Sequence, residues 1–452
     1  MGDIVFGVDV LDKYFRSALE PPATVVVAGH PGAGKTTLAS TICYANALKG
    51  YRCLYISFQE DKDKFFRNMA GVGIDLRLAE EKRLFTFTKF PVVLDAERVI
   101  EHINSIVISF NPKIIVIDPI NAMLLSVSDE SKRAWLQNYF YELAKQINGL
   151  VVLVAELPFG VEQLGLGSLE FVADAVVILK HRIEDGKLVR IMEFRKMRGS
   201  PLTLAELPFA IIPGAGLKIY TPIVLEELPA EGEAVKNPCK LLDTTIGTVR
   251  RGHIILFLYP LHARPPDLFL LIHGYMLANN AKTLLISFRA SPKTICDSMI
   301  NSLSQFGIEA EHVKRFVKEN MVFKSFNPYS LSSSELLAQL IELIEHTKPD
   351  IVVLHALDIL AIALEQKHFQ VMYNLLNYLK SRHILTIITS ADVNTDIRTA
   401  FMRLSDIIIR FRYSLVNGLS KKVFVWRREK DPFIATEVEL RSCRDEIAKL
   451  VK

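Results

Sequence analysis

The sequence predicts an α/β protein made of two tandem domains, each a mostly parallel sheet flanked by helices. The chain has 452 residues, which at ~150 residues per domain suggests two or three domains. Short β-branched runs alternate with longer mixed stretches, as in repeated βαβ units. The same order of runs occurs twice along the chain, which indicates two copies of one domain.

The first copy contains four short apolar runs. Such continuous runs are typical of strands that are buried on both faces, so helices are expected on both sides of the sheet. They cover residues 24–29, 53–58, 113–118 and 149–156.

A second set of runs follows residues 226–237, which are acidic, contain Pro and Gly and have no apolar period. We interpret 226–237 as a linker between a domain at 1–225 and a domain at 238–452. The second set of runs covers residues 253–258, 283–288, 350–355 and 383–392.

Composition narrows the class of protein. Half of the residues are hydrophobic and 23% are charged, which excludes disorder of the whole chain. No stretch without charged residues reaches the ~18 apolar residues of a spanning helix, so no membrane segment is expected. Lys and Arg (54) exceed Asp and Glu (50) by only four, which leaves no electrostatic footprint for nucleic acid.

The termini and cysteines suggest a cytoplasmic protein. Acidic residues at Asp3, Asp9 and Asp12 stand where a signal peptide would be basic and then apolar. The five cysteines lie far apart without a C-x-x-C pair, so we expect neither a zinc site nor a disulfide framework.

The strongest chemical motif is a glycine-rich loop, GHPGAGKT, between an apolar strand and a helical stretch. In such a loop, backbone N–H groups surround phosphates, Lys35 reaches the outer phosphates and the Thr36 hydroxyl binds magnesium. His30 is expected to be a solvent-facing residue. The predicted nucleotide-binding residues are Gly29, His30, Pro31, Gly32, Ala33, Gly34, Lys35, Thr36 and Thr37.

A phosphate-binding loop needs an acid to hold magnesium, usually at the end of a neighbouring strand. Asp118 closes the run IIVID and fits that role. Because Pro119 follows, Asp118 could instead be a turn or N-cap residue, and we favour the magnesium role.

Residues 57–76 and the segment EFVADAVVIL through KMRGS (170–202) resemble KaiC and its relatives in the RecA superfamily. The resemblance covers essentially residues 3–222 and includes the tandem arrangement. It implies a ring, usually of six subunits, with ATP held between neighbours. Lys196 and Arg198 match the pair that reaches the γ-phosphate of the adjacent subunit, and without the resemblance they would equally well be a solvated basic turn.

Hydrolysis needs a group that polarises the attacking water. Relatives of KaiC have two consecutive glutamates after the second strand, where this chain has Gln59 and Glu60. Gln59 can orient a water but cannot accept a proton, so turnover is slow or absent if the base belongs there. Glu156, at the end of another strand, is either a sensor of the nucleotide or an ordinary strand-end residue.

The second copy lacks these features. An offset of 229 places Lys35 on Arg264 and Thr36 on Pro265, in a segment without glycine. Two adjacent prolines there remove two N–H donors. Arg289 and Ala290 stand in place of Gln59 and Glu60, and His355 stands in place of Asp118. Arg428 and Lys430 stand in place of Lys196 and Arg198. They are either interface residues or, as we favour, a solvated charge run. We therefore expect a second domain without ATPase chemistry that serves ring assembly or an unidentified protein partner.

The leading interpretation is an ATP-binding, ATP-hydrolysing ring protein that uses magnesium. A second is a non-hydrolysing nucleotide sensor or scaffold that resembles the archaellum-motor relative of KaiC, and Gln59 supports it. A RadA-type recombinase is disfavoured because the segment 157–171 has no Lys or Arg for phosphate contact.

Overall fold

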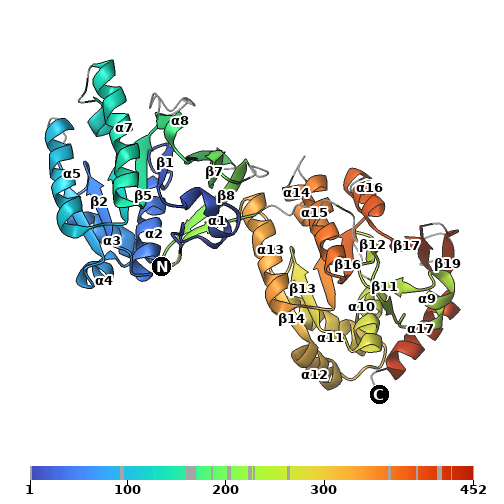
Figure 1. Cartoon of the computed structure of the whole chain (residues 1–452). Helices are drawn as coiled ribbons and strands as arrows, with labels where there is room; N and C mark the ends of the chain where they lie inside the picture. The colour runs from blue at the N-terminus through green and yellow to red at the C-terminus, as the bar shows by residue number, and fades with distance from the viewer. Residues whose placement is uncertain are drawn as a thin grey trace. The chain divides into compact units, whose positions relative to one another are not determined.

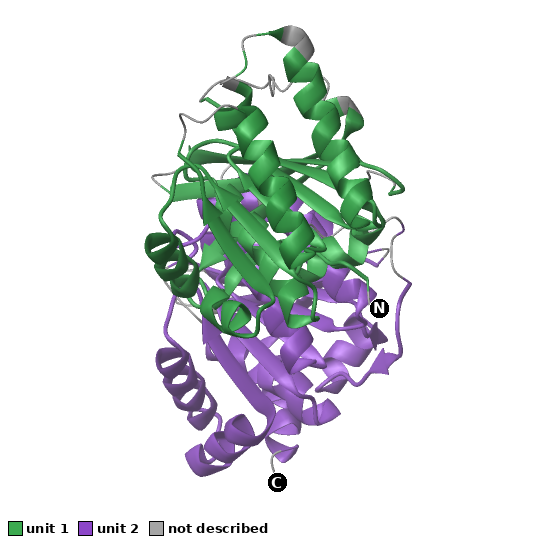
Figure 2. Ribbon diagram, turned by 60° about the vertical axis from the view of Figure 1, so that its left-hand side comes forward, with its two compact units in different colours: residues 1–221 green, residues 222–452 purple. Residues whose placement is uncertain are grey.

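A computed structural model describes the chain in segments, and two compact units, residues 1–221 and 222–452, divide it (Figures 1 and 2). The described residues are 3–91, 96–125, 127, 129–158, 169–184, 187–200, 205–221, 227, 230–261, 265–364, 368–392, 395–414, 420–428 and 430–450. Arg264 and most of the segment 157–171 lie outside them.

Unit 1 is built on a nine-stranded sheet in the order β3-β2-β4-β5-β1-β6-β7-β8-β9. Strands β1 to β6 pair in parallel, and β7 to β9 add an antiparallel extension. The strands are β1 (Ala23–Gly29), β2 (Cys53–Ser57), β3 (Phe85–Lys89), β4 (Ile114–Asp118), β5 (Leu150–Glu156), β6 (Ala175–Glu184), β7 (Lys187–Met197), β8 (Glu206–Ile212) and β9 (Gly216–Ile219).

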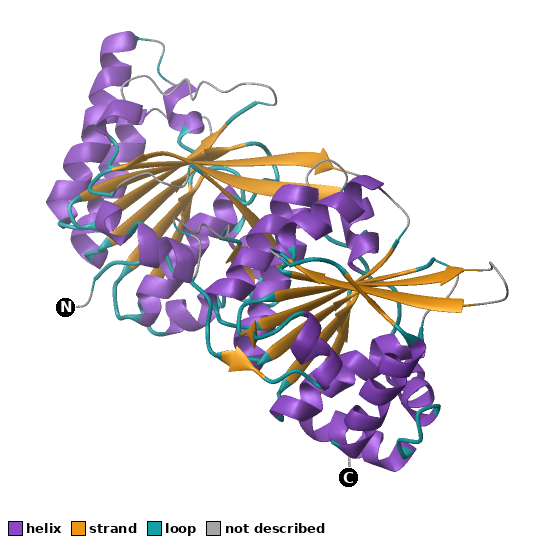
Figure 3. Cartoon of the chain, turned by 90° about the vertical axis from the view of Figure 1, so that its right-hand side faces the viewer, coloured by secondary structure: helices purple, strands orange, loops and turns teal. Residues whose placement is uncertain are grey.

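Helices cover both faces of this sheet (Figure 3). Val25 and Val27 of β1 pack into one core, whereas Val26 and Ala28 pack into the other, so the strand is buried on both sides as predicted. The helices are α1 (Asp9–Tyr14), the 3₁₀ turn η1 (Arg16–Leu19), α2 (Lys35–Leu48), α3 (Lys62–Gly71), α4 (Leu76–Glu81), α5 (Ala96–Phe110), α6 (Asn121–Leu125), α7 (Glu130–Ile147) and α8 (Leu169–Val172).

Unit 2 repeats the plan with an eight-stranded sheet in the order β14-β13-β15-β16-β12-β17-β18-β19. Its strands are β12 (Ile254–Tyr259), β13 (Thr283–Ser287), β14 (Met321–Ser325), β15 (Ile351–His355), β16 (Leu385–Ala391), β17 (Ile407–Ser414), β18 (Ser420–Arg427) and β19 (Phe433–Ala435), beside the small pair β10 (Ala234–Val235) and β11 (Val249–Arg250). The helices are α9 (Lys240–Thr245), α10 (Pro266–Asn279), α11 (Pro292–Ser304), α12 (Ala310–Asn320), α13 (Ser333–Thr347), α14 (Leu357–Ala363), α15 (His368–Ser381), α16 (Thr395–Leu404) and α17 (Glu437–Lys449). The predicted fold class, two tandem α/β domains with mostly parallel sheets, is confirmed.

Part of the predicted linker belongs to unit 2. Strand β10 pairs with β11, and the Asn237 amide donates to the Asp243 carboxylate (2.9 Å) and to the carbonyl oxygen of Gly247 (2.8 Å). The boundary between the units falls at 221/222. The segment 226–237, which we interpreted as a linker, therefore lies within unit 2.

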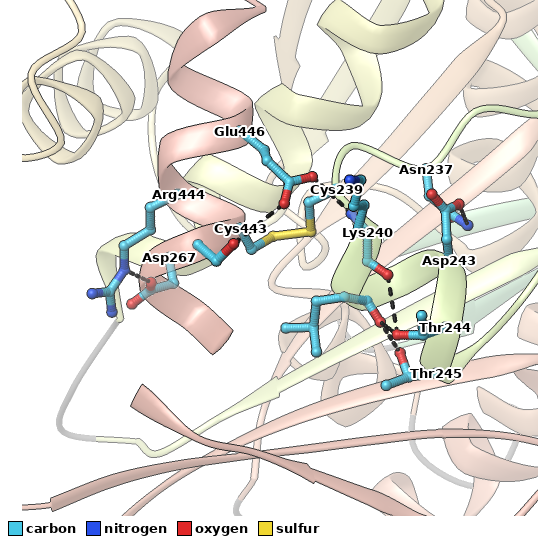
Figure 4. Close-up of a disulfide and its surroundings, with 12 residues drawn as sticks. Asn237, Cys239, Lys240, Asp243, Thr244, Thr245, Asp267, Cys443, Arg444 and Glu446 are labelled. Carbon is cyan, nitrogen blue, oxygen red and sulfur yellow. Dashed lines mark hydrogen bonds and ion pairs between the residues drawn. A yellow bond between two sulfur atoms is a disulfide. The ribbon is translucent and has the colours of Figure 1, made fainter. Parts of the chain in front are cut away.

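A disulfide in unit 2 corrects the expectation that the cysteines stay unpaired. Cys239 and Cys443 are joined with their Cα atoms 5.2 Å apart (Figure 4). The bond ties α17 to the start of α9, where Lys240 N–H also donates to the Glu446 carboxylate (2.8 Å). The partners are 204 residues apart in sequence, so their spacing carries no motif that could have predicted the pairing.

We expect Cys443→Ser to destabilise unit 2 by roughly 2–5 kcal/mol, because the disulfide restricts the unfolded chain over a long loop. The chain has two tryptophans, Trp135 in unit 1 and Trp426 in unit 2, so Trp426 fluorescence in a Trp135→Phe background reports the unfolding of unit 2 by urea. Cys296→Ser, which removes a free thiol, is the control. Equal midpoints for Cys443→Ser and the oxidised parent would contradict the expectation.

Unit 2 also buries a histidine without hydrogen bonds. His273 of α10 packs edge-on against Phe316, with ring centroids 5.0 Å apart, and neither ring nitrogen has a hydrogen-bond partner within the described part of the chain. Burial lowers the pKa of His273 to about 4.

This histidine should make unit 2 less stable in acid. The folded pKa lies below the unfolded value, so the unfolded state binds more protons as pH falls from about 6.5 toward 4, and stability is lost in that window. Between pH 7.5 and pH 5 the loss from His273 should be about 2 kcal/mol. His273→Leu should remove this part of the pH dependence of the Trp426 transition; an unchanged slope in His273→Leu would refute the assignment.

Candidate functional site

The glycine-rich loop joins β1 to α2 at the carboxyl edge of the unit 1 sheet. Gly34 caps α2 with φ +105°, and Gly32 has φ +72°, both in the left-handed region that favours glycine. A Cβ on Gly34 would lie 2.7 Å from Ile211 Cδ1, and one on Gly29 would lie 2.2 Å from the Leu179 carbonyl oxygen. Backbone conformation therefore favours glycine at positions 32 and 34, and the close approach of the Leu179 backbone requires it at position 29.

Lys35 is buried within this loop. Its Nζ donates to the carbonyl oxygen of His30 (2.9 Å), which holds the ammonium against the backbone of the loop. Burial lowers the pKa of Lys35, and the negative charges of Glu156 and Asp118 oppose this shift. A phosphate arriving at the loop would compensate the buried charge, as the motif predicts.

The remaining loop residues differ in exposure. Pro31 and Gly32 are exposed, whereas Ala33 and Thr37 are buried. His30 is partly buried, with its ring edge-on to His181 at 5.7 Å between centroids, so the expectation of a solvent-facing residue is wrong. Burial, then the charges of His181, Lys180 and Lys35, lower the pKa of His30.

Thr36 and Asp118 meet directly beside the loop. Thr36 Oγ1 donates to Asp118 Oδ2 (2.8 Å), and the buried Tyr55 hydroxyl donates to the same oxygen (2.6 Å). Burial raises the pKa of Asp118, the two hydrogen bonds oppose this shift, and the charge of Glu60 raises the pKa further. A hydroxyl and a carboxylate are the hard oxygen ligands that magnesium prefers, so these residues fit that ion. Sequence reasoning missed Tyr55, which reads only as one position of a buried strand.

Gln59 and Glu60 follow β2, where the backbone turns at Ser57. Ser57 Oγ accepts hydrogen bonds from Gln59 N–H (3.3 Å) and Glu60 N–H (3.0 Å). The Gln59 side chain donates from Nε2 to Glu156 Oε1 (3.0 Å). Gln59 and Glu156, which are 97 residues apart, thus form one polar pair near the loop.

Asn121, at the start of α6, holds the backbone of Glu156. Glu156 N–H donates to Asn121 Oδ1 (2.7 Å), and Asn121 Nδ2 donates to the Glu156 carbonyl oxygen (3.2 Å). Nothing in the sequence around Asn121 indicated this role.

Lys196 and Arg198 lie at the opposite edge of the sheet. Asp174 accepts hydrogen bonds from Arg198 (2.7 Å) and from Thr24 N–H (2.9 Å). Thr24 precedes the loop residue Gly29 by five residues of β1, which corresponds to a length of roughly 16 Å along the strand. Lys196 Nζ donates to the carbonyl oxygen of Glu170 (3.4 Å). The structure therefore does not bring Lys196 and Arg198 together with the loop of the same chain.

Corresponding hydrogen bonds align the two units residue by residue. Thr24 N–H donates to Asp174, and Ile254 N–H donates to Asp406 (2.8 Å). The shift between Thr24 and Ile254 is 254 − 24 = 230, so the offset of 229 is wrong by one at these strands. The runs at 24–29 and 253–258 share no polar residue at the correct register, so these two runs by themselves could not fix the offset.

At this register, Tyr259 stands in place of Gly29. Leu157 N–H donates to the Gly29 carbonyl oxygen (2.9 Å), and Asp392 N–H donates to that of Tyr259 (2.8 Å). The Tyr259 side chain is buried at 1% exposure, where unit 1 tolerates no Cβ. Pro265 then caps α10, the counterpart of α2.

Other unit 2 residues occupy equivalent positions with different chemistry. Arg289 and Ala290 N–H donate to Ser287 Oγ as Gln59 and Glu60 do to Ser57. His355 Nδ1 lies 3.0 Å from Ser287 Oγ. Arg428 N–H donates to the Asp406 carbonyl oxygen (3.3 Å), the counterpart of Arg198 N–H and Asp174.

An internal ion cluster stands at the N-terminal end of α10. The buried Asp267 carboxylate accepts from Arg444 Nε of α17 (2.7 Å) and pairs with Lys421 of β18 (Figure 4 shows Asp267 and Arg444). Burial raises the pKa of Asp267, but the hydrogen bonds and charges of Arg444 and Lys421 outweigh it, so the net pKa is lowered. A carboxylate of the chain thus takes the place beside a helix N-terminus that a phosphate takes in a nucleotide site.

Two kinds of feature are absent from the described residues. No helix there combines the length and the apolar composition of a membrane span. No cluster of three or more His, Cys, Asp or Glu side chains within those residues could hold a metal ion.

Comparison with known proteins adds an independent line of evidence. Residues 4–223, which is all of the described part of unit 1, match the KaiC ATPase family. The chain is 25% identical to the circadian clock protein KaiC3 of Synechocystis sp. over 438 residues, 91% of this chain and 84% of that protein. It is also 28% identical to KaiC of Picosynechococcus sp. over 228 residues (47% of this chain, 43% of that protein) and 25% identical to KaiC of Parathermosynechococcus lividus over 197 residues (43% and 36%).

The similarity to KaiC3 extends over both units, whereas the other two alignments cover less than half of the relative. The phosphate-binding loop, the Thr36–Asp118 contact and the family match agree with one another. Unit 1 is therefore a KaiC-type ATPase domain of the P-loop kind, and the chain as a whole is similar to KaiC3 over both units.

Proposed function

We propose that unit 1 binds ATP with magnesium and hydrolyses it at the contact between neighbouring copies of this chain in a six-membered ring. The position of Lys196 and Arg198 carries the proposal, because they lie roughly 16 Å along the sheet from the loop of their own chain. Any action of their charge on a nucleotide would therefore be on the nucleotide of another copy. A finger supplied in trans couples turnover to assembly.

The side chains near the loop would bind the phosphates, hold magnesium and act on the attacking water. The loop N–H groups and Lys35 bind the phosphates, and Thr36 and Asp118 would hold magnesium, whose charge neutralises the phosphates when it is bound. Tyr55 keeps Asp118 Oδ2 oriented toward Thr36. Glu60 and Gln59 stand beside these residues as candidates to act on the attacking water.

For unit 2 we propose a structural part without nucleotide chemistry. Tyr259, Pro265 and the Asp267 cluster replace the features that bind phosphate in unit 1. The unit would then serve ring assembly or bind a protein partner. A cytoplasmic location stays a prediction, and the disulfide requires surroundings in which that bond persists.

A non-hydrolysing nucleotide sensor is the second candidate. The observation in its favour is that the side chain at position 59 is an amide, which cannot accept a proton. Steady-state phosphate release from the purified protein, at several protein concentrations, separates the two: release that rises with concentration supports the ring ATPase, and tight ATP binding without release supports the sensor.

Lys35→Ala should weaken ATP binding by roughly 10- to 100-fold, because it removes charge-assisted hydrogen bonds of ~1.5–3 kcal/mol to the phosphates. Isothermal titration calorimetry with magnesium measures this and gives the stoichiometry, expected to be one ATP per chain. Lys49→Ala, at the other end of α2, is the matched control and should bind normally. Two ATP per chain would refute the assignment of unit 2.

Lys196→Ala/Arg198→Ala should keep ATP binding but lose most phosphate release, because the trans charge is worth several orders of magnitude in rate. Arg195→Ala, on the same strand, removes a positive charge that pairs with Glu193 (2.8 Å) and serves as the control. Mixing the Lys196→Ala/Arg198→Ala protein with inactive Lys35→Ala protein should restore release, since each supplies what the other lacks. Absence of any recovery after subunit exchange would contradict action in trans.

A further inference from the structure

Glu156 occupies a central position at the loop. Strand β5 pairs in parallel with β1, and the register places Glu156 opposite Gly29, the first residue of the loop. The carboxyl edge of such a sheet is where ligands bind in open α/β folds. The Glu156 carboxylate therefore stands at the edge that receives the phosphates.

The partner of this carboxylate is Gln59. Gln59 Nε2 donates to Glu156 Oε1 (3.0 Å), so the amide nitrogen is directed at the carboxylate. The carbonyl oxygen of the same amide is a hydrogen-bond acceptor, which lets the side chain orient a water. The pair thus combines a water-orienting group with a group that can accept a proton.

The backbone of Glu156 is held in place. Asn121 accepts from Glu156 N–H (2.7 Å) and donates to its carbonyl oxygen (3.2 Å), which restricts both sides of this strand end. The charge of Glu156 also acts on Lys35, where it opposes the lowering of the pKa by burial. Glu156 is therefore close to the lysine that meets the outer phosphates.

Glu60 differs from Glu156 in its surroundings. Its charge acts on Asp118, so it lies on the side of the Thr36–Asp118 pair. Within the described residues, the two glutamates near the loop are thus divided between the side of Asp118 and the side of Gln59.

We propose that Glu156 is a catalytic residue of unit 1, the carboxylate that accepts the proton of the attacking water, and that Gln59 positions that water. This inference rests on the proposed ATPase function and deepens it. The water oxygen bonds to the γ-phosphorus, the bond from that phosphorus to the bridging oxygen breaks, and ADP leaves with the electron pair. The proton released by the water passes to the Glu156 carboxylate and then to solvent. In this scheme Gln59 does not have to accept a proton, because Glu156 does so.

The test measures ATP affinity and phosphate release separately on the full chain. Glu156→Gln should lower kcat by roughly 100-fold or more, as expected for loss of a general base. The Kd for ATP should change less than threefold, roughly, because the phosphate-binding groups stay in place. Glu156→Asp keeps the carboxylate and should recover part of the rate, whereas Glu142→Gln, at an exposed site on α7, should behave like the parent.

A purely structural role of Glu156 must be distinguished from its proposed role as proton acceptor. Trp135 fluorescence in a Trp426→Phe background reports the stability of unit 1, which Glu156→Gln should leave nearly unchanged. Gln59→Ala should lower kcat, and its effect should largely vanish when Glu156→Gln is already present, because the two residues act as a pair. The kcat of Glu60→Gln is compared with that of Glu156→Gln.

The outcomes separate the inference from the proposed function. If the parent releases phosphate and Glu156→Gln releases it at the same rate, Glu156 is not the proton acceptor, while the ATPase function stands. Loss of unit 1 stability in Glu156→Gln together with Glu156→Asp would also overturn the inference. If the parent binds ATP without release, hydrolysis and the role of Glu156 both fail, and nucleotide binding alone remains.

Discussion

Parallel pairing of β1, β2, β4 and β5 is the constraint on which the site depends. Parallel strands end at the same edge, so Gly29 comes to lie opposite Glu156, and Ser57 opposite Asp118. The loop begins at this edge, and α2 directs its first turn toward it. Residues from four distant segments therefore meet without any long insertion, and a one-residue shift of β1 would separate them.

The same strand order keeps Lys196 and Arg198 away from the loop of their own chain. Strand β6 runs parallel to β1 and β7 returns antiparallel, so the end of β7 lies at the edge opposite the loop. The position of Lys196 and Arg198 follows from this reversal of direction. Asp174 accepts a hydrogen bond from Arg198 at that edge. In the proposed ring, the two edges of neighbouring copies would face each other, which links ATP turnover to assembly.

Unit 2 keeps the backbone scheme and replaces its chemistry. The bonds of Thr24 to Asp174 and of Ile254 to Asp406 are equivalent, yet Tyr259 fills the position of Gly29. The helix that would point at a phosphate instead has Asp267, neutralised by Arg444 and Lys421. The disulfide further fixes α17 beside these residues, so the charge of Asp267 is balanced within unit 2.

The sequence by itself determined the fold class, the strand runs, the phosphate-binding loop and the family, because apolar periodicity and short contiguous motifs are local properties. It indicated Asp118 and Glu156 by their places at strand ends. Only the tertiary structure decided the register of the second unit, the Cys239–Cys443 bond, and the contacts of Tyr55 with Asp118, Asn121 with Glu156 and Gln59 with Glu156. These depend on which distant segments become neighbours, and apolar strands and isolated polar residues carry no local signal of their partners.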